Sequence, residues 1–297
     1  MNEPGVGPED PTRYDPPPPA VREAVARALA EDLLPLGDLT ASLVPATSRV
    51  ALDIVSRSRG VLAGRACVAE VVRQLDPGIE VRWDRWDGSE LAPGDVVARL
   101  DGPLRSILTA ERTMLNFLCH LSGVASSTRD LVVAVREANP ATRVLDTRKT
   151  TPGLRSLEKA AVRAGGGVNH RGGLSDAVLV KDNHLGGMTI AEAVGRARAL
   201  WPGRMVEVEC DRPDQVDEAV AAGATVVMLD NMTPDQVEGC VPVVHAAGVL
   251  VEVSGGITLA SAARYAAAGA DLLSVGALTH SAPILDLGLD LAGATEP

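Results

Sequence analysis

The sequence predicts an α/β protein in two parts, a small mixed α/β unit followed by a larger region of parallel strands. Short apolar runs alternate with helical patterns from Arg143 onward, which is typical of parallel strands joined by helices. The 297 residues are 46% hydrophobic, enough to bury more than one core, and only 2% are aromatic, so aliphatic side chains must fill it. A barrel and an open doubly wound sheet both fit this pattern.

The N-terminal part begins with residues 1–19, which are rich in proline, glycine and acidic residues and are expected to form a disordered tail. A helix is expected near 20–34. Three β-like runs follow before residue 108, namely VALDIVS, GVLAG and VVARLDG. This part reads as a small α/β unit without an evident reactive cluster.

A long helix is predicted from Thr109 to about Ala138, because apolar residues recur there at helical spacing. Thr109 is expected to be its N-cap. Gly123 is expected to interrupt it and give two segments.

The third part alternates strands and helices. The predicted strands are 143–146, 177–181, 205–210, 225–229, 249–253 and 271–275. The predicted helices lie near 153–164, 190–200, 212–222, 234–247 and 258–268. This order favours parallel strands with right-handed crossovers.

Charged residues and glycines stand where these strands end or just beyond. In chain order they are Asp146, Arg148, Lys149, His170, Arg171, Lys181, Glu209, Asp230, Asn231, Ser254, Gly255, Gly256 and Gly276. In a parallel α/β barrel the carboxyl ends of the strands converge on one face, where active sites are built. The sequence therefore predicts one site, with cations, carboxylates and glycine turns supplied by successive parts of the chain.

Positive charge is concentrated in this region. All three lysines (Lys149, Lys159 and Lys181) lie within it, and residues 146–184 hold seven basic and four acidic side chains, against a net charge of −11 for the chain. A local cationic cluster suits a pocket for a small, multiply charged anion. The overall negative charge argues against a nucleic acid or a membrane surface as partner.

Each kind of residue has a chemical use. Arg148 and Lys149 are adjacent, so they point different ways and can serve two anionic groups. Glycine turns let backbone N–H groups approach a phosphate closely. Glu209 and Asp230 can hold Mg²⁺, directly or through water, or stabilise positive charge developing on a sugar ring.

Other charged residues are expected to have structural roles. Glu207 is expected to face away from the barrel interior. Asp182, His120 and His245 are also expected to be structural, whereas His184 is left open between a supporting role in the site and the surface. The solvated face of a helix is the interpretation for Arg155, Lys159 and Arg163.

The four cysteines, which lie far apart without metal-ligand spacing, are expected to be thiols in a reducing compartment. The N-terminus lacks the basic and apolar regions of a signal peptide, and no apolar run approaches membrane-spanning length. A cytoplasmic protein is expected.

Ordered motifs also suggest a family. They are ERTMLN at 111–116, DTRKTTPGLR at 146–155, GGGVNHR at 165–171, VKDNH at 180–184, VEVE at 206–209, MLDN at 228–231, SGGI at 254–257 and SVGALTHSAPILDLGLD at 274–290. Together they resemble quinolinate phosphoribosyltransferase, from about residue 20 to 290. The departures are Arg65, Cys210 and Val253, and none of them removes a charged site position.

The resemblance implies a small N-terminal α/β sandwich domain at 20–117 and an irregular TIM-like α/β barrel at 118–282. Residues 283–297 are expected to return to the first domain. It also implies a homodimer in which Arg112 reaches into the partner's site, and Mg²⁺ as cofactor. The implied reaction transfers phosphoribosyl from phosphoribosyl pyrophosphate to quinolinate, giving nicotinate mononucleotide, pyrophosphate and CO₂ in NAD biosynthesis.

The resemblance also implies roles for individual residues. Those around the quinolinate carboxylates are Arg112, Arg148, His170, Arg171 and Lys181. Those on the phosphoribosyl side, with its metal, are Lys149, Glu209 and Asp230, and Thr147 is a further binding residue. The phosphate-binding turns are Ser254, Gly255, Gly256, Val275, Gly276 and Ala277, with His280 nearby. Lys149, Lys181, Glu209 and Asp230 are the candidate catalytic residues.

Two alternatives stay open at this point. Lys181 at a strand end is also compatible with a Schiff-base aldolase. A non-catalytic homologue kept as a binding or metal-transport accessory protein is the other, although the retained carboxylates and cations argue against it.

Overall fold

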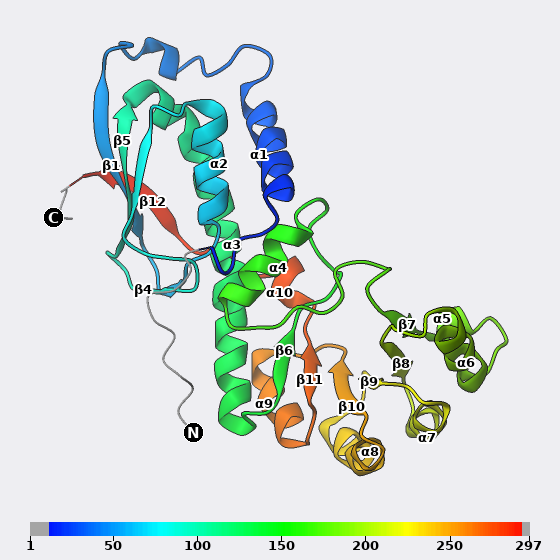
Figure 1. The fold of residues 1–297 in the computed structure, drawn as a ribbon. Coiled ribbons are helices and arrows are strands. Elements are labelled where there is room, and N and C mark those ends of the chain that lie inside the picture. Colours follow the sequence, from blue (N-terminus) through cyan, green and yellow to red (C-terminus); the bar gives the residue numbers. More distant parts are fainter. Residues whose placement is uncertain (1–11, 293–297) are drawn as a thin grey trace. The chain divides into compact units, whose positions relative to one another are not determined.

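The structure, a computed structural model, describes residues 12–292 and has the α/β class that the sequence predicts (Figure 1). Its chain forms two compact units. The first takes the described residues up to Ser127, then Thr151–Gly166 and the described residues from Ser281 on; the second takes Thr128–Thr150 and Gly167–His280. The expected tail falls largely on residues 1–11, outside the described part, and helix α1 already begins at Pro18.

The first unit combines short strands with helices (Figure 1). Its strands are β1 (Arg49–Ser56), β2 (Gly60–Val61), β3 (Glu80–Trp83), β4 (Glu90–Leu91), β5 (Val96–Pro103) and β12 (Leu287–Leu291). Its helices are α1 (Pro18–Leu33), the 3-10 turn η1 (Ala41–Leu43), α2 (Arg65–Leu75), α4 (Arg155–Ala164) and the first part of α3 (Leu104–Ala138).

The main sheet of this unit is antiparallel, with strand order β12-β1-β5-β3. Strand β12 comes from the far end of the chain and pairs with β1, placing Leu289 opposite Ile54. The fully buried side chains Ile54, Val97 and Leu100 anchor this sheet. The segment after residue 283 thus completes the sheet that the N-terminal part begins.

Helix α3 is one uninterrupted helix of 35 residues, and two expectations about it were wrong. Thr109 is not the N-cap, because α3 begins at Leu104 and the Thr109 hydroxyl donates to Asp38 instead. Gly123 does not break the helix. A Cβ there would lie 2.0 Å from the Pro283 carbonyl oxygen, so glycine permits close packing of the returning C-terminal segment.

The expectation that α4 presents Arg155, Lys159 and Arg163 on a solvated face was also wrong. Lys159 is 6% exposed and Glu158 is fully buried, while Arg155 and Arg163 are half-buried. His120, expected to be isolated, lies 2.9 Å from the Glu158 carboxylate through its Nε2. Small neighbours such as Ala160 and Ala161 let α4 pack closely, so its charged residues are buried and form specific contacts.

The second unit is built on six parallel strands (Figure 1). They are β6 (Arg143–Leu145), β7 (Val178–Val180), β8 (Val206–Cys210), β9 (Val226–Asp230), β10 (Leu250–Ser254) and β11 (Leu272–Ser274). The helices between them are α5 (Asp182–Leu185), α6 (Ile190–Leu200), α7 (Pro213–Ala222), α8 (Pro234–Ala246) and α9 (Leu259–Ala267), and α10 (Ala277–His280) follows β11. The predicted strands and the five main helices are confirmed within a few residues.

The strands of the second unit lie in the order β6-β11-β10-β9-β8-β7. This is the cyclic order of a barrel, opened between β6 and β7. Among the described residues no ladder joins these two strands, and the free edge of β6 instead makes a single parallel bridge from Leu145 to Val168. The predicted barrel is therefore found as an irregular parallel sheet without hydrogen-bonded closure.

Local signals explain where these helices begin. Thr189 and Thr233 accept hydrogen bonds from the backbone three residues on, and Glu192 and Gln236 return the contact, so both form capping boxes. The two threonines thereby fix the residues at which α6 and α8 begin. Within residues 12–292, no helix is both long and apolar enough to span a membrane.

Candidate active site

A cavity of about 400 Å³ opens at the carboxyl ends of the parallel strands of the second unit. Its lining residues are Thr147, Arg148, Lys149, His170, Arg171, Leu179, Lys181, Glu209, Met228, Asp230, Ser254 and Ser274. The structure thus brings together most of the charged residues that the strand ends predicted. Leu179, Met228 and Ser274 were not predicted.

Alternate residues along a strand line this cavity. Lys181 and Leu179 lie two apart at the end of β7, and Asp230 and Met228 lie two apart on β9. Side chains two apart in a strand share a face. The polar member of each pair stands nearer the carboxyl end and the apolar member lies deeper, so the cavity has a charged rim over a packed floor.

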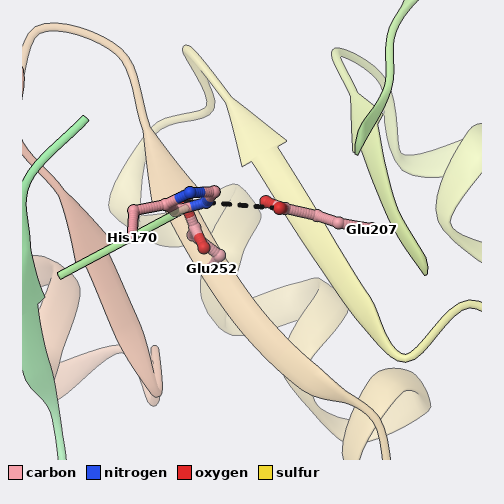
Figure 2. Close-up of side chains that lie close together, drawn as sticks. All are labelled: His170, Glu207 and Glu252. Atoms are coloured by element: carbon pink, nitrogen blue, oxygen red, sulfur yellow. Dashed lines mark ion pairs between the residues drawn. The ribbon is translucent and has the colours of Figure 1, made fainter. Parts of the chain in front are cut away.

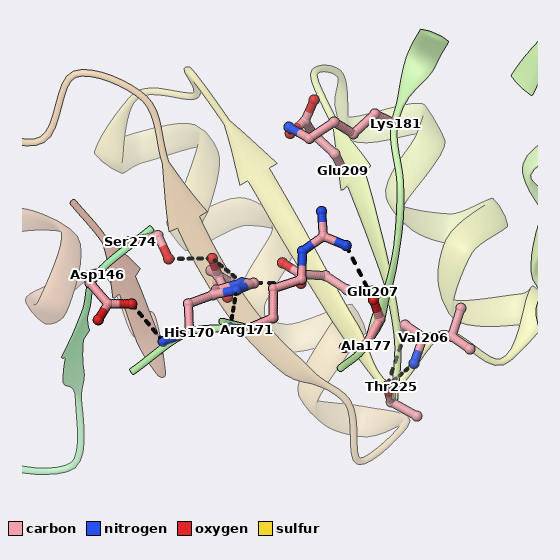
Figure 3. Close-up of polar contacts among 11 residues, drawn as sticks. Asp146, His170, Arg171, Ala177, Lys181, Val206, Glu207, Glu209, Thr225 and Ser274 are labelled. Carbon is pink, nitrogen blue, oxygen red and sulfur yellow. Dashed lines mark hydrogen bonds and ion pairs between the residues drawn. The ribbon is translucent and has the colours of Figure 1, made fainter. Parts of the chain in front are cut away.

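Two guanidinium groups meet in the cavity. Burial lowers the pKa of Arg171, and the nearby charge of Arg148 lowers it further. The Arg171 side chain donates to the Ala177 carbonyl at 3.1 Å, which fixes its direction (Figure 3). Two like charges on the lining of one cavity favour an anion there, so the pair is a candidate anion-binding element.

Lys181 and Glu209 form an ion pair across the ends of β7 and β8 (Figure 3). The resemblance assigns them to different substrates, yet here they contact each other directly. The Lys181 nitrogen is thus engaged with Glu209, whereas a Schiff-base nucleophile must reach the carbonyl of its substrate. Glu209 makes this contact through Oε2, and its other oxygen can take a further ligand.

Asp230 is held by its neighbour Asn231. The Asn231 amide donates to the Asp230 carboxylate at 2.6 Å, and the Asn231 N–H donates to the Ser254 carbonyl at 2.9 Å. Asn231 has φ of 57°, in the left-handed region, and Gly255 packs against it so closely that a Cβ would lie 2.3 Å from the Asn231 side-chain oxygen. Asn231 therefore links the carboxylate of β9 to the glycine turn after β10.

A second glycine turn lies beside Lys149. A Cβ at Gly276 would fall 3.1 Å from the Lys149 side chain and 3.2 Å from the His280 ring. The Thr279 hydroxyl donates to the Lys149 carbonyl at 2.7 Å. The turn is thereby tied to the segment that carries the cations.

Beneath the rim, His170 meets two buried glutamates (Figure 2). Its Nε2 lies 3.2 Å from Glu207 on β8 and 3.4 Å from Glu252 on β10. Both glutamate side chains are at most 2% exposed, and the Ser274 hydroxyl donates to Glu252 at 2.5 Å. One ligand atom from each of the three residues lies within 4.8 Å of the others, close enough to hold a metal ion.

Two observations on the His170 ring point in opposite directions. Burial lowers its pKa, but hydrogen bonding and the charges of Glu207 and Glu252 outweigh this and raise the pKa to about 10. The Arg171 N–H, however, donates to Nδ1 at 2.8 Å, which requires a lone pair there. Because Nδ1 accepts this hydrogen bond, the ring in this conformation is neutral and its proton lies on Nε2, toward the carboxylates.

Further carboxylates fix the loop that carries His170 and Arg171, and Figure 3 shows one of them, Asp146. Fully buried Asp146 accepts from the His170 N–H at 2.9 Å and from the Asn169 amide at 2.6 Å. Asp176 accepts from two glycine N–H groups that follow Arg171. A segment with little regular structure is thus held at its backbone.

The expectation that Glu207 faces away from the interior was wrong. Glu207 and Glu209 lie two apart on β8, so they share one face by the period of a strand. The same rule places Glu252 below Ser254 on β10. Sequence reasoning missed the site roles of Glu207, Glu252 and Ser274, although strand periodicity applied one step deeper would have found the first two.

Several predicted residues do not line the cavity. These are Arg112, Gly255, Gly256, Val275, Gly276, Ala277 and His280. The glycines and His280 belong to the turns around it, whereas Arg112 is exposed on α3 in the first unit. His184 is exposed and accepts the Lys181 N–H at 3.0 Å, which makes it a cap of α5. His245 is paired with Asp271 at 2.9 Å.

Comparison of the chain with models of known protein families identifies its relatives. The profile described as Quinolinate phosphoribosyl transferase, C-terminal domain, matches residues 124–290, and that of the N-terminal domain matches residues 38–122. The chain belongs to the quinolinate phosphoribosyl transferase family.

Individual members of this family are similar over nearly their full length. The nicotinate-nucleotide pyrophosphorylase [carboxylating] of Mycobacterium leprae is 44% identical over 92% of this chain and 97% of its own. The rat protein of the same name is 38% identical, covering 92% of each. A solved structure of the nicotinate-nucleotide pyrophosphorylase from Francisella tularensis has a TM-score of 0.88 and 41% identity, over 93% of this chain and 97% of that one.

Proposed function

We propose that the protein transfers the phosphoribosyl group of phosphoribosyl pyrophosphate to quinolinate, releasing pyrophosphate and CO₂ and forming nicotinate mononucleotide for NAD biosynthesis. The observation that carries this proposal is the content of one cavity. It gathers Arg148, Arg171 and Lys149 with the carboxylates of Glu209 and Asp230. Two polyanionic substrates need the cations, and a transferred sugar cation needs the carboxylates.

The two substrates divide the cavity between them. Arg148, His170 and Arg171 form the half that takes the vicinal carboxylates of quinolinate, because their side chains lie next to one another. Planar guanidinium groups match carboxylates in bidentate geometry. Lys149 lies beside the glycine turn at Gly276, which suits the phosphate groups of the other substrate. Lys181 stands at the boundary, in contact with Glu209.

Chemistry then follows from position. The bond from C1′ to pyrophosphate breaks, and Glu209 and Asp230 stabilise the positive charge that develops on the ribose. The ring nitrogen of quinolinate, aligned by Arg148 and Arg171, forms the new bond to C1′. The nitrogen is then positively charged and stabilises the carbanion left on the adjacent ring carbon when its carboxylate departs as CO₂, after which that carbon takes a proton. Electrostatics and orientation suffice, without a covalent enzyme intermediate.

Mg²⁺ fits the carboxylates of this cavity. Glu209 and Asp230 offer hard oxygen donors from adjacent strands, and their described contacts to Lys181 and Asn231 engage one oxygen of each. When bound, Mg²⁺ would neutralise the charge of the leaving pyrophosphate. Asn231 keeps the Asp230 carboxylate oriented for this role.

The deciding assay mixes the protein with quinolinate, phosphoribosyl pyrophosphate and Mg²⁺ and measures nicotinate mononucleotide and CO₂. We expect both products in equal amounts. Arg171→Ala should weaken quinolinate binding, whereas Arg196→Ala, which removes an exposed arginine of α6, should not. Product formed equally well from nicotinate in place of quinolinate would contradict the proposed substrate.

A homodimer is part of this proposal, with Arg112 reaching the partner's cavity. Arg112 is exposed and does not line the cavity of its own chain. Next to it in the first unit, Arg105, Thr109 and Thr113 of α3 make hydrogen bonds to residues 32–44. This segment displays four leucines that are 65–83% exposed: Leu34, Leu36, Leu39 and Leu43. An ordered apolar surface of this kind suits a subunit interface.

Complementation tests the dimer. Arg112→Ala and Lys149→Ala should each be inactive, since each removes one component from every site. Mixed and allowed to exchange, they should recover about a quarter of wild-type activity, because half the dimers are mixed and each restores one of two sites. Activity that stays absent, in a sample shown to be dimeric by light scattering, would rule out a shared site.

The two alternatives make different predictions. Borohydride with a carbonyl substrate would trap Lys181 in an aldolase, and we expect no trapping because its ammonium is paired with Glu209. A binding protein without activity would show no turnover in the assay. A cytoplasmic location also belongs to this proposal, supported by four cysteines that are all free thiols.

A further inference from the structure

The strongest feature not used by the proposed mechanism is the buried pair Glu207 and Glu252. They come from β8 and β10, on either side of β9, and their carboxylates converge on one atom, the Nε2 of His170 (Figure 2). Two buried carboxylates repel each other and lose hydration, which is unfavourable unless a partner lies between them. The core of this unit is therefore built to hold the imidazole.

The other nitrogen of the His170 ring connects it to Arg171. Nδ1 of His170 accepts the Arg171 N–H at 2.8 Å, so the ring sets the backbone from which the Arg171 side chain extends. That side chain is then fixed by its hydrogen bond to the Ala177 carbonyl (Figure 3). A displacement of the ring would thus move the cationic side chain of Arg171.

We propose that Glu207 and Glu252 are positioning residues for the dicarboxylate half of the cavity, anchoring His170 from below and, through it, Arg171. Neither glutamate lines the cavity, so neither is assigned a contact with substrate. Ser274 supports Glu252 through its hydroxyl. The inference rests on the proposed function, since it gives this half of the cavity to quinolinate.

Steady-state kinetics provide the first test. Glu207→Gln keeps the size of the side chain and removes its charge. We expect KM for quinolinate to rise about tenfold, the usual scale for a supporting residue, with KM for phosphoribosyl pyrophosphate changed less than twofold. Glu252→Gln should behave alike. The matched control is Glu238→Gln, an exposed glutamate of α8 in the same unit, which should change neither constant. Equal rises in both KM values for Glu207→Gln would indicate general damage and overturn the proposal.

A binding test works without turnover. Phthalate carries the same vicinal carboxylates as quinolinate but lacks the ring nitrogen, so it cannot react. Glu207→Gln should weaken phthalate binding about tenfold by calorimetry and shift the imidazole ¹⁵N signals of His170, assigned with His170→Asn. Unchanged phthalate affinity and unchanged His170 signals would overturn the proposal. If wild-type protein binds phthalate but turns over no quinolinate, the proposed function fails and the positioning role is still measured.

Two further measurements close the remaining routes. Should Glu207→Gln fail to fold, Ser274→Ala removes only the hydroxyl that supports Glu252 and should raise KM for quinolinate about threefold, again selectively. The three residues also have the spacing of metal ligands. One equivalent of zinc or manganese in purified wild-type protein, lost in Glu207→Gln, would overturn the positioning role in favour of a metal site.

Discussion

The two compact units use their arginines for different purposes. In the first unit, the Arg99 guanidinium binds Asp53 through two hydrogen bonds, at 2.7 and 2.8 Å, on neighbouring strands. In the second, Arg148 and Arg171 line the same cavity, where burial and the charge of Arg148 lower the pKa of Arg171. Cations paired with carboxylates stabilise a fold, whereas several cations that line one cavity can bind an anionic ligand.

Arg65 sharpens this contrast from the side of the first unit. Its guanidinium lies between two indole rings, 3.9 Å from the centroid of Trp86 and 4.6 Å from that of Trp83. It stacks on the protein itself, as guanidinium groups do on aromatic faces. Removing such an arginine should affect stability, and removing an arginine of the cavity should affect catalysis.

The largest expected effect is that of Arg148→Ala. We expect kcat/KM to fall about 1000-fold, or about 4 kcal/mol, because a desolvated carboxylate loses its charged partner. The melting temperature should be unchanged or higher, since repulsion with Arg171 is relieved. The matched variant Arg65→Ala should lower stability by about 1–2 kcal/mol and leave kcat/KM intact. Effects of the same kind for both arginines would remove the distinction between the units.

Gly123→Ala tests the packing of the first unit. The new Cβ would lie 2.0 Å from the Pro283 carbonyl oxygen, a backbone atom that cannot move aside. We expect a loss of about 3 kcal/mol in urea unfolding, although alanine favours a helix. Gly239→Ala in α8, where no atom lies within 4 Å of the new Cβ, should instead gain about 0.5–1 kcal/mol. A stable Gly123→Ala would show that the returning segment packs loosely.

Asn231 tests the link between β9 and the glycine turn. Asn231→Gly keeps the left-handed backbone and removes the amide that holds Asp230, so kcat/KM should fall about tenfold, or about 1.4 kcal/mol, at unchanged stability. Asn231→Ala should lose about 1 kcal/mol of stability in addition, because alanine disfavours φ of 57°. Activity in Asn231→Gly equal to wild type would mean that Asp230 needs no support.

A pH-dependent effect is expected from Asp87 in the first unit. Burial raises its pKa to about 6, against hydrogen bonds from the Gly64 and Arg65 N–H groups that lower it. The folded state therefore favours the protonated acid, so its stability contribution is present below about pH 4 and is lost as pH rises to about 6. We expect wild-type protein to lose about 1–2 kcal/mol more than Asp87→Asn across this window, measured by urea unfolding. Parallel curves would exclude Asp87 as the cause.

The sequence predicted the second unit better than the first for a physical reason. Parallel strands place every strand end at one edge, so local order along the chain predicted the residues of the cavity. The first unit depends on distant pairing, and β12 meets β1 only because the chain returns. Nothing local in the sequence marks that contact. Helix α2 was not predicted, although Cys67, Val68 and Val71 form a buried apolar face at helical spacing.

The buried residues beneath the cavity could not be predicted from the strand ends alone. Reading only the last residue of each strand predicts a rim, and Glu207 and Glu252 lie one layer below it. The support that Asp146 gives to His170 depends on the path of an irregular loop, which propensity does not predict. Lys159 shows the reverse error, since a charged residue on a helix was taken for a solvated one but is buried in this fold.

Helix α3 has a consequence for any attempt to dissect the protein. Its 35 residues extend about 50 Å, and the change from the first unit to the second falls at Thr128, within it. The two family profiles also meet inside it, between residues 122 and 124. A fragment cut at that boundary would inherit half a helix with a severed end and unsatisfied carbonyls or N–H groups. A fragment that is to be expressed alone should therefore begin or end outside residues 104–138. A split reporter inserted near Gly123 would first of all report that this helix is broken.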